Sequence, residues 1–549
     1  MSFLELFETL LKQRGISSEE SEAYLNPDYS KLHDPLLLPD MKKARDRVIK
    51  AIKKSEKIVI FSDYDADGIP GAVVLSDFFR RAEYKNVSFY IPHRHDEGFG
   101  LNIEAVEECA EKGTKLMITV DCGTADAEEM KRANELGIDV IVTDHHEASV
   151  MPEAYAIINP KRSGSKYPFK ELCGAAIAFK LVQAILKKEN FACLPARQGI
   201  KEGMEKWSLD MVGIATLSDM VPLVGENRIF AKFGLDVLRK SPRPGLAALF
   251  NTLNLNRKTL TEDDIVFMIT PRINAASRMG VPHDAFKLLS TDDAAEAQIL
   301  AAHLEKINNE RKGVVAAMVK DAKKHLASQE NLPGVIVIGN PEWRPSLAGL
   351  VASALVEKYE RPAFVWARDG EGVLKGSCRS YNGYDLFGLM EKTKDSFIEF
   401  GGHAGAGGFS VTLEKLPELE ERLSEALGSL SCEEISEKSG FSISLSDIGE
   451  DLWRIVAQFA PFSTGNEKPV FKIANAPIKS VRQFGKEANH LELSLGNGIK
   501  AISFFSSPAS YKLPADSRTC DLSCTLEKSY FRNRPELRLR IVNILINDK

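Results

Sequence analysis

The sequence has no apolar run long enough to cross a bilayer, and its first residues, Met-Ser-Phe-Leu-Glu-Leu-Phe-Glu, are acidic and lack the apolar core of a cleavable leader. It also lacks a strong charge of either sign, because 71 Lys and Arg residues stand against 77 Asp and Glu residues. We therefore expect a protein of the cytoplasm. The net charge of -6 argues only weakly against a nucleic-acid partner, since a near-neutral total conceals local patches.

Paired cysteines are also missing. The eight cysteines are scattered, at positions 109, 122, 173, 193, 378, 432, 520 and 524. This spacing fits neither a zinc ribbon nor a disulfide framework, so reduced thiols are expected. Cys520 and Cys524 lie four residues apart, but neither a second pair nor a nearby histidine completes a four-ligand zinc site.

The chain is too long for one core: 549 residues with 44% hydrophobic content predict three or four packed units. Breaks at Gly15, Pro27 and Pro35 suggest short helices that pack on the main domain. A Ser/Glu-rich stretch at 428–440 is typical of a linker. The predicted units are a helical extension (1–45), an α/β domain (46–290), a connecting helix (291–330), a smaller α/β domain (331–427) and a β-rich module (441–549).

The first α/β domain is predicted from alternating patterns. Apolar runs expected to form strands occupy 57–62, 87–91, 115–120 and 138–143, and helical patterns lie between them at 69–82, 102–112 and 125–136. This alternation indicates a parallel sheet with crossover helices. Residues 292–327 keep helical spacing without an internal proline, which predicts one long helix between two domains. The short alternating segments after 441 favour a small β-barrel.

Two of the predicted strands end in residue types that bind metals. Asp65 and Asp67 follow the run 57–61, and His145 and His146 follow the run 138–143. Open parallel sheets place their chemistry at the carboxyl ends of strands, so these side chains are expected to share one cation site.

Asp121 and Asp219 complete a mixed carboxylate and imidazole set that suits Mn²⁺, and Mg²⁺ less well. Six ligands exceed the share of one ion, and with a bridging carboxylate they can hold two cations about 3.5 to 4 Å apart, the arrangement that cleaves phosphodiesters. The alternative for a single acidic residue after a strand is a helix cap, which stays open for Asp63, Asp126 and Asp144.

At this point the residues resemble a known family. Asp65-x-Asp67, Asp121, Asp144-His145-His146 and Asp219 are similar to the four motifs of the DHH phosphoesterase superfamily, and residues from about 40 to 472 resemble its RecJ family. Supporting segments are Tyr90-Ile-Pro-His-Arg-His-Asp-Glu-Gly-Phe-Gly-Leu-Asn102, Arg272-Ile-Asn-Ala-Ala-Ser-Arg278, Asn340-Pro-Glu-Trp343, Phe400-Gly-Gly-His-Ala-Gly-Ala-Gly-Gly408 and Ala460-Pro-Phe-Ser-Thr-Gly-Asn466.

The resemblance implies an α/β fold with a parallel-sheet DHH catalytic domain, a long linker helix, a smaller DHH-associated α/β domain and an OB-like barrel. It implies a two-metal exonuclease using Mn²⁺ or Mg²⁺ that degrades single-stranded DNA from its 5′ end and releases mononucleotides in recombination and repair. A single-strand-binding protein and a helicase are candidate partners. The implied ligands, which are also the catalytic residues, are Asp65, Asp67, Asp121, His145, His146 and Asp219, with Asp63 and Asp144 orienting them.

Two segments depart from the family pattern. Relatives commonly continue the Asn340-Pro-Glu-Trp343 segment with His and Gly, whereas Arg344 and Pro345 follow here, so polar DNA contacts there are expected to differ. Ser463 and Glu467 stand where relatives usually have Gly and Pro, which concerns a turn rather than the chemistry.

Several residues outside the metal set are candidate substrate contacts. Arg272, Asn274 and Arg278 are expected to grip the phosphate backbone near the scissile bond, and surface ion pairs are the alternative. His403 lies in a glycine-rich stretch whose amides can approach an anion closely, and Arg379 is a further phosphate candidate.

The β-rich module carries basic residues among aromatic ones near its C-terminal end. We expect Tyr530 and Arg532 to contact a single strand, with Phe531, Lys528, Arg534, Arg538 and Arg540 around them. A solvated charged hairpin is the competing interpretation.

Two other functions compete with the exonuclease. Smaller DHH relatives cleave short oligoribonucleotides or cyclic dinucleotides, against which the extra barrel and the chain length argue. A nucleic-acid-binding scaffold without catalysis predicts missing ligands, and the sequence contains all six.

Overall fold

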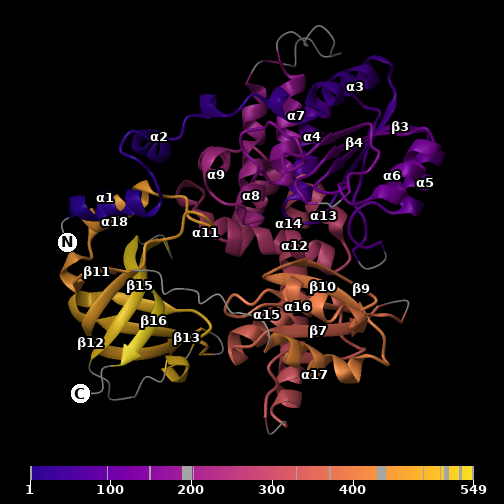
Figure 1. The fold of residues 1–549 in the computed structure, drawn as a ribbon. Coiled ribbons are helices and arrows are strands. Elements are labelled where there is room, and N and C mark those ends of the chain that lie inside the picture. The colour runs from indigo at the N-terminus through magenta and orange to yellow at the C-terminus, as the bar shows by residue number, and fades with distance from the viewer. Residues whose placement is uncertain are drawn as a thin grey trace.

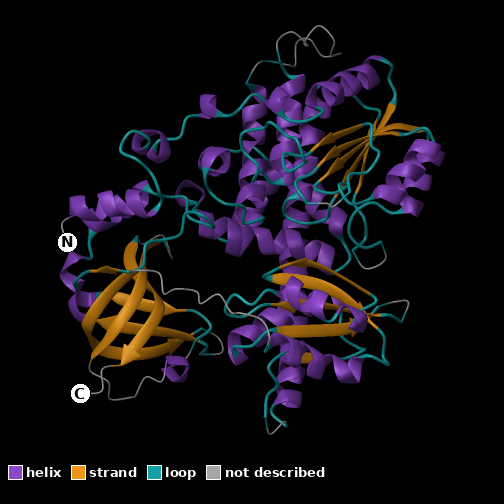
Figure 2. Cartoon of the chain, viewed as in Figure 1, coloured by secondary structure: helices purple, strands orange, loops and turns teal. Residues whose placement is uncertain are grey.

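The computed structural model describes residues 3–94, 97–147, 150–187, 201, 203–328, 331–369, 372–428, 440–485, 488–506, 508–511, 519–530 and 535–546. Three sheets occupy these residues, each in a separate module (Figures 1 and 2). None of the helices in the described ranges combines the length and apolar character needed to cross a bilayer. The six described cysteines are buried and free, which confirms for them the prediction of unpaired thiols.

The first sheet is parallel throughout and has the order β2-β1-β3-β4-β5. Its strands are β1 (Lys57–Ser62), β2 (Val87–Tyr90), β3 (Thr114–Val120), β4 (Asp139–Thr143) and β5 (Ala156–Ile158). The crossover helices are α4 (Gly68–Arg81), α5 (Ile103–Glu111) and α6 (Ala127–Glu135). These elements confirm the predicted alternation, and β5 is an addition to it.

A helical layer follows the sheet in sequence. It contains α7 (Gly174–Ile185), η4 (Met204–Ser208), α8 (Leu209–Ser218), α9 (Gly225–Leu238), α10 (Pro244–Thr252), η5 (Arg257–Thr259), α11 (Glu262–Asp264), the π-helical turn η6 (Ile265–Ile269), α12 (Thr270–Arg278) and α13 (Pro282–Ser290). Helix α7 contacts β3 and β4, and α7 and α8 both pack on the crossover helix α4. The core helix α8 is buried over almost its whole length, and it ends at Asp219.

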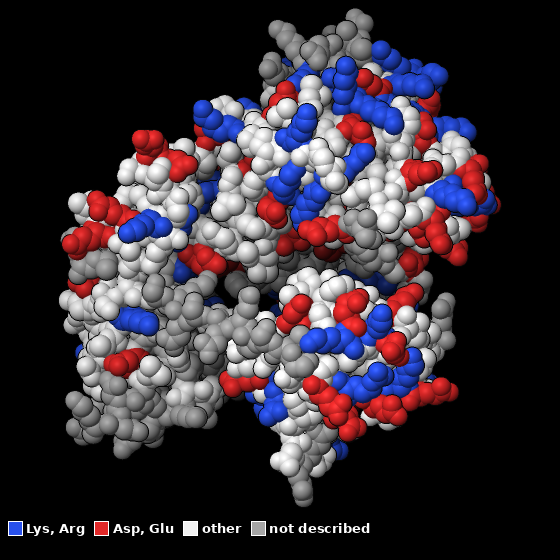
Figure 3. All heavy atoms as spheres, viewed as in Figure 1, with Lys and Arg blue, Asp and Glu red and all other residues white. Residues whose placement is uncertain are grey.

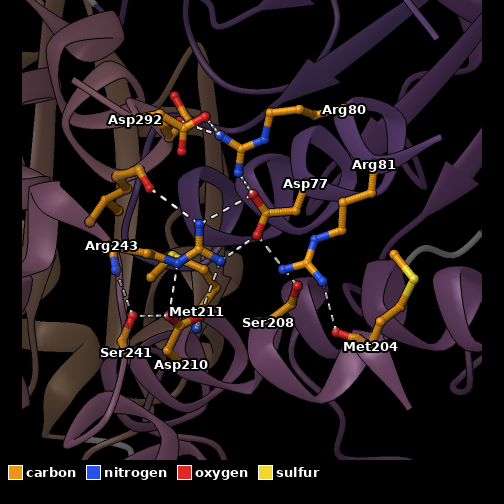
Figure 4. Close-up of polar contacts among 12 residues, drawn as sticks. Asp77, Arg80, Arg81, Met204, Ser208, Asp210, Met211, Ser241, Arg243 and Asp292 are labelled. Atoms are coloured by element: carbon orange, nitrogen blue, oxygen red, sulfur yellow. Dashed lines mark hydrogen bonds and ion pairs between the residues drawn. The ribbon is translucent and has the colours of Figure 1, made fainter. Parts of the chain in front are cut away.

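A buried ion network joins α4 to α8 (Figure 4). The Arg243 guanidinium donates to Asp210 on α8 at 2.7 Å and to Asp77 on α4 at 3.2 Å, and Ser241 donates to Asp210 at 2.7 Å. Asp77 lies nine residues after the start of α4 and Asp210 nine residues before Asp219, about 14 Å along each helix. The network therefore fixes the ends of α4 and α8 that lie away from Asp67 and Asp219.

One long helix, α14 (Ala294–Leu326), joins two hydrophobic cores. Its first half contributes Ala297, Ala301 and Leu304 to the core of the first module. Its second half contributes Met318, Ala322 and Leu326 to a different core. The structure thus confirms one helix bridging two units, as 292–327 predicts.

The second module is built on a five-stranded sheet with the order β6-β7-β8-β10-β9, in which only β6 and β7 run parallel. The strands are β6 (Ile336–Gly339), β7 (Ala363–Arg368), β8 (Leu374–Arg379), β9 (Glu399–His403) and β10 (Ala406–Val411). The helices are η7 (Pro345–Leu347), α15 (Ala348–Tyr359), α16 (Leu386–Lys392), η8 (Lys394–Ser396) and α17 (Leu416–Leu427). In Figure 1, β9 and β10 lie at the side facing α12 and α13.

The C-terminal module is a closed barrel, because β12 pairs with both β13 and β15 and so completes the ring. Its strands are β11 (Phe441–Ser442), β12 (Phe471–Phe484), β13 (His490–Leu495), β14 (Lys500–Ser503), β15 (Thr519–Ser529) and β16 (Glu536–Ile546). Its helices are η9 (Leu445–Asp447), α18 (Glu450–Gln458), η10 (Gly496–Gly498) and η11 (Pro508–Tyr511). Closure confirms the predicted barrel.

The N-terminal extension is not an appendage of the first module alone, which corrects that prediction. Leu6, Leu10 and Leu11 of α1 (Phe3–Gln13) belong to the core of the C-terminal barrel. Only the later part, with α2 (Ser21–Leu25), η1 (Tyr29–Lys31), η2 (Pro35–Leu37) and α3 (Met41–Lys53), leads back to the first module. The apolar face of α1 shows that it packs somewhere, but not on which module.

Most of the predicted linker at 428–440 lies outside the described residues. The domain boundaries drawn from the sequence stay predictions. Figure 3 shows a recess between the first module and the second, with basic side chains visible inside it.

Candidate metal centre

Six side chains that the sequence predicts as metal ligands come together at the carboxyl edge of the first sheet. Asp65 and Asp67 follow β1, Asp121 follows β3, and His145 and His146 follow β4, while Asp219 ends α8. Nε2 of His145 lies 3.2 Å from Asp121 Oδ1, 3.6 Å from Asp219 Oδ2 and 3.8 Å from Asp67 Oδ2. Segments far apart in the chain therefore supply one cluster.

The cluster contains three groups of side chains whose possible ligand atoms lie within 4.8 Å of one another inside each group. They are Asp121 with His145 and His146, Asp67 with His145 and Asp219, and Asp63 with Asp65 and Asp121. Asp121 and His145 each occur in two groups, which is the overlap that a two-cation site requires. Asp63 stands among the possible ligands here, whereas the sequence predicts an orienting role for it.

The cluster contains carboxylate oxygens that accept no hydrogen bond. Asp63 Oδ1 and Asp121 Oδ1 are buried and find no hydrogen-bond donor among the described residues. A buried, unpaired carboxylate oxygen is costly, and hard oxygen donors of this kind bind Mg²⁺ or Mn²⁺. The residues present therefore fit a divalent cation.

Asp67 is held by the start of α7. Its two carboxylate oxygens accept from the backbone amides of Gly174 at 2.6 Å and Ala175 at 2.8 Å. A Cβ on Gly174 would lie 2.6 Å from Asp121 Oδ1, so only glycine lets the helix approach both carboxylates. Asp65 is fixed locally, since its Oδ1 accepts from the amide of Asp67 at 2.7 Å.

Asp144 contacts both histidines, in agreement with the orienting role that the family resemblance implies for it. Its Oδ1 accepts from the amide of His145 at 2.7 Å and lies 2.8 Å from His146 Nδ1, and its Oδ2 accepts from the amide of Thr124 at 3.0 Å. A carboxylate on one ring nitrogen fixes the orientation of the imidazole and makes it a better ligand.

The carboxyl groups of the cluster repel one another. Burial, followed by the charges of neighbouring aspartates, raises the pKa of Asp67 to about 6 and that of Asp219 to about 8. The same causes raise the pKa of Asp63 and of Asp121 well above the usual range. A divalent cation removes this repulsion, because its charge stabilises every ionised carboxylate around it.

The two histidines differ in protonation. Burial, together with the charge of His146, lowers the pKa of His145 to about 3. Burial also disfavours the charged form of His146, but the hydrogen bond to Asp144 and the charges of Asp144, Asp219 and Asp67 together outweigh burial and raise the pKa of His146 to about 9. His145 is thus ready to bind a metal, whereas His146 must first lose a proton.

Two of the predicted substrate contacts have structural partners. Asn274 Oδ1 accepts from the amide of Ala66 at 2.9 Å and so supports the loop between Asp65 and Asp67. Arg272 is buried, and its Nε donates to Glu305 on α14 at 2.7 Å. The ion-pair alternative agrees with this contact, although Arg272 itself is buried and only Glu305 is partly exposed. The DNA contact of Arg272 stays a prediction.

Arg278 lies in a group of arginines from four segments. Burial, and then the charges of Arg94, Arg311 and Arg379, lower the pKa of Arg278 to about 9. Arg94 lies 4.9 Å from the centre of the Tyr64 ring, and Nε of Arg311 is buried without a partner among the described residues. Such mutual repulsion is relieved by an anion. The sequence did not single out Arg94 or Arg311, although Arg94 falls within the segment Tyr90 to Asn102.

The remaining predicted contacts lie on the second module and on the barrel. His403 is exposed at the end of β9, where its Nδ1 accepts from the amide of Gly405 at 3.2 Å. Tyr530 is half-buried just after β15, and Arg532 lies outside the described residues together with Phe531 and Arg534. Lys528 pairs with Glu450 at 2.8 Å and Arg538 pairs with Glu527, which agrees with the charged-hairpin alternative for these two.

The barrel also carries a cluster of aromatic and basic side chains that the sequence did not predict. Phe484, Phe504 and Phe505 surround His490 with ring centres 5.0 to 5.1 Å from it. The guanidinium of Arg540 lies 4.1 Å from the centre of the Phe504 ring, and Phe505 is 76% exposed. Phe504 and Phe505 are adjacent in the sequence, but the side chains around them come from three other strands, β12, β13 and β16.

Comparison with known families assigns each module. The chain matches the DHH family, N-terminal domain, over residues 57–216, the DHHA1 domain over residues 331–429 and the RecJ OB domain over residues 441–543.

Two curated relatives and one solved structure extend the likeness over most of the chain. The single-stranded-DNA-specific exonuclease RecJ of Bacillus subtilis is 36% identical over 498 residues, which is 90% of this chain and 61% of the relative. The exonuclease of the same name from Dickeya dadantii is 32% identical over 77% of this chain and 75% of the relative. The crystal structure of Thermus thermophilus RecJ in complex with Mn²⁺ has a TM-score of 0.80 at 27% identity and covers 99% of this chain and 76% of that one.

Proposed function

Because the chain belongs to the RecJ family of the DHH phosphoesterase superfamily, we propose that it is a divalent-metal-dependent exonuclease that degrades single-stranded DNA from its 5′ end. Its products are mononucleotides and its setting is DNA recombination and repair in the cytoplasm. The chain spans 61% of the length of the Bacillus relative, so activity and substrate are argued from its own residues as well.

The observation that carries the proposal is the convergence of buried carboxylates with two histidines at one edge of a parallel sheet. Asp67, His145 and Asp219 would hold one cation, and Asp63, Asp65 and Asp121 a second, with Asp121 also within reach of the histidines. Mn²⁺ suits the mixed oxygen and nitrogen donors, and Mg²⁺ is the alternative. Bound cations would polarise the scissile phosphate, lower the pKa of an attacking water and stabilise the leaving oxygen.

The protein's own groups position this chemistry. Asp144 holds His146 in orientation, the first amides of α7 hold Asp67, and Asn274 supports the loop between Asp65 and Asp67. No side chain of the cluster needs to act as a nucleophile, because hydrolysis uses water. Asp144 acts beside the ligands by orienting them. Asp63 is itself a possible ligand.

The arginine cluster is the proposed phosphate grip. Arg94, Arg278, Arg311 and Arg379 come from the first module, the long helix and the second module, so an anion among them would contact all three. Arg278 also donates to Ser346 O at 2.6 Å, which links the first module to the second. Arg272 and His403 stay predicted contacts of the same DNA strand.

The barrel is the proposed site for the more distant nucleotides. The exposed Phe505, with Phe504 under Arg540, offers rings for bases beside positive charge for phosphates. Tyr530 and Arg532 stay predicted contacts of the same module. A single-strand-binding protein and a helicase are the expected protein partners.

The test is digestion of one oligonucleotide labelled separately at each end, with Mn²⁺ present. Release of labelled mononucleotide from the 5′ end at the outset, and from the 3′ end only last, is expected. Asp67→Ala and His145→Ala should abolish release, while Asp451→Ala, which removes an exposed carboxylate from the barrel's helix α18, should not. Undiminished release by the first two variants would refute the assignment.

The same samples separate the rival functions. Faster turnover of a dinucleotide than of a long strand would favour the oligonucleotide hydrolases among DHH relatives. Tight binding of a single strand without hydrolysis under any divalent ion would favour a binding scaffold.

A further inference from the structure

The segment Ala460-Pro-Phe-Ser-Thr-Gly-Asn466 is a marked motif of the sequence, but it contributes no residue to the metal centre. Together with Phe459 it forms a loop, called here the docking loop (459–466), between α18 and the first long strand of the barrel. This loop packs against residues 220–224, the connection that follows Asp219. The C-terminal module therefore touches the chain immediately behind a candidate metal ligand.

The contact is close and involves the backbone. Thr464 O accepts from the amide of Leu223 at 2.8 Å. Gly465 has a φ of +74°, and a Cβ there would lie 3.2 Å from Pro222 Cβ. A side chain at position 465 would be strained both by the backbone conformation and by Pro222.

The connection is short and begins directly after the end of α8. Asp219 is the last residue bound into α8, through its amide and Ala215 O at 2.9 Å, and Met220 already has a positive φ of 57°. Asn227 secures the other side of the connection, because its side-chain amide donates to Pro222 O at 3.1 Å. The docking loop and Asn227 thus hold the connection from two sides.

Arg228, on the first turn of α9, ties the docking loop to the first module. It is buried, and it donates to three backbone carbonyls, Tyr24 O at 2.7 Å, Phe459 O at 3.1 Å and Ala460 O at 3.3 Å. The guanidinium also lies 3.9 Å from the centre of the Tyr24 ring. Three carbonyls in different directions require the planar fork of arginine.

Asn466 fixes the shape of the loop. Its amide nitrogen donates to Phe459 O at 2.8 Å and Pro461 O at 2.7 Å. Its Oδ1 accepts from Arg14 Nε at 2.7 Å and from the Tyr24 hydroxyl at 2.8 Å. A buried amide with this many partners defines one conformation, since losing any of them leaves a buried polar group unpaired.

We propose that the docking loop positions Asp219 for metal binding: by fixing residues 220–224 it fixes the direction in which the Asp219 carboxylate leaves α8. The C-terminal module then sets the affinity of the metal centre in addition to contacting nucleic acid. Arg228 and Asn466 are positioning residues, since neither belongs to the ligand groups. The inference rests on the proposed function only in taking Asp219 as a ligand.

The test is a titration of the full chain with Mn²⁺ in the absence of DNA, followed by calorimetry or electron paramagnetic resonance. Asn466→Ala and Arg228→Lys should each weaken Mn²⁺ binding about tenfold, the usual effect of losing a group that orients a ligand. In digestion assays they should lower kcat while KM for a single strand stays within about twofold.

Lys468→Ala is the matched control. Lys468 forms an ion pair with Asp263 and so also links the barrel to the first module, but it lies outside the docking loop and, among the described residues, forms no hydrogen bond with residues 220–224. This variant should bind Mn²⁺ like the wild type. Heat unfolding on the same samples identifies folded variants, and if Asn466→Ala does not fold, Asn466→Asp, which keeps the acceptor for Arg14 and Tyr24, takes its place.

Asp219→Ala is the reference variant, because it removes the candidate ligand itself. If it loses Mn²⁺ affinity while Asn466→Ala and Arg228→Lys keep it, the positioning role of the docking loop is overturned and the proposed function is not. If Asp219→Ala itself binds Mn²⁺ like the wild type, the ligand assignment fails, and this proposal fails with it.

Discussion

Removing the guanidinium of Arg243 should destabilise the first module strongly. This side chain lies between two buried carboxylates, Asp77 on α4 and Asp210 on α8 (Figure 4). Arg243→Met keeps most of the volume but leaves both charges without their main partner. Breaking a buried ion pair costs about 3 to 5 kcal/mol. Asp77 retains Arg80 at 2.6 Å and Asp210 retains Ser241 at 2.7 Å, so we expect the lower end, about 3 kcal/mol.

Trp207 provides the assay, because it precedes Ser208, whose hydroxyl donates to Asp77. With Trp343, Trp366 and Trp453 replaced by Phe, fluorescence follows urea unfolding near the network alone. At an m value of about 3 kcal/mol per M, a loss of about 3 kcal/mol lowers the urea midpoint by about 1 M.

Arg454→Met is the control, since Arg454 pairs with Asp451 at 3.1 Å on an exposed surface, where an ion pair contributes about 1 kcal/mol or less. Adding Asp77→Asn and Asp210→Asn to Arg243→Met should recover part of the loss, because the unpaired charges are then gone. An equal loss in the control, or no recovery in the triple variant, would show that buried charge is not the reason.

Four further outcomes follow from the site and the barrel. Mn²⁺ affinity should rise with pH between about 6 and about 9, because the pKa values of Asp67, Asp219 and His146 lie near 6, 8 and 9. Mn²⁺ binding should also release protons, which calorimetry in two buffers can measure. These raised values also stabilise the metal-free fold at low pH, and this contribution is lost as pH rises through them, so the metal-free unfolding temperature should fall from pH 4 to pH 9 while Mn²⁺ restores it. Arg311→Met should raise KM for a single strand about tenfold with little change in kcat and reduce the dependence of KM on salt, whereas a change in kcat alone would speak against a phosphate contact. Phe505→Ala should weaken binding of long strands by about 1 to 3 kcal/mol and leave a strand too short to reach the barrel unaffected, as fluorescence anisotropy would show.

The sequence predicts those parts of the fold that rest on periodicity. Buried strands such as β1 and β4 are continuous apolar runs, and α14 keeps helical spacing over its whole length. Most of the candidate ligands were predictable for the same reason, because Asp65, Asp67, Asp121 and the two histidines directly follow such strands, whereas Asp219 follows the helix α8. The strand β5 has three residues, too few for any period to show.

Contacts between modules could not be predicted from local patterns. The apolar face of α1 does not specify which module it packs on, and its place on the barrel depends on tertiary packing. Arg94 and Arg311 join Arg278 only because the first module, α14 and the second module meet there. Asp63 was expected to orient ligands, since nothing in the sequence shows that its Oδ1 is buried without a partner.

The central claim is that Asp63, Asp65, Asp67, Asp121, the two histidines and Asp219 bind two divalent cations. The most direct test is anomalous diffraction from crystals of the chain grown with Mn²⁺. We predict two manganese peaks, both in contact with Asp121 or His145 and about 3.5 to 4 Å apart. Manganese located elsewhere, with none among these side chains, would contradict the account.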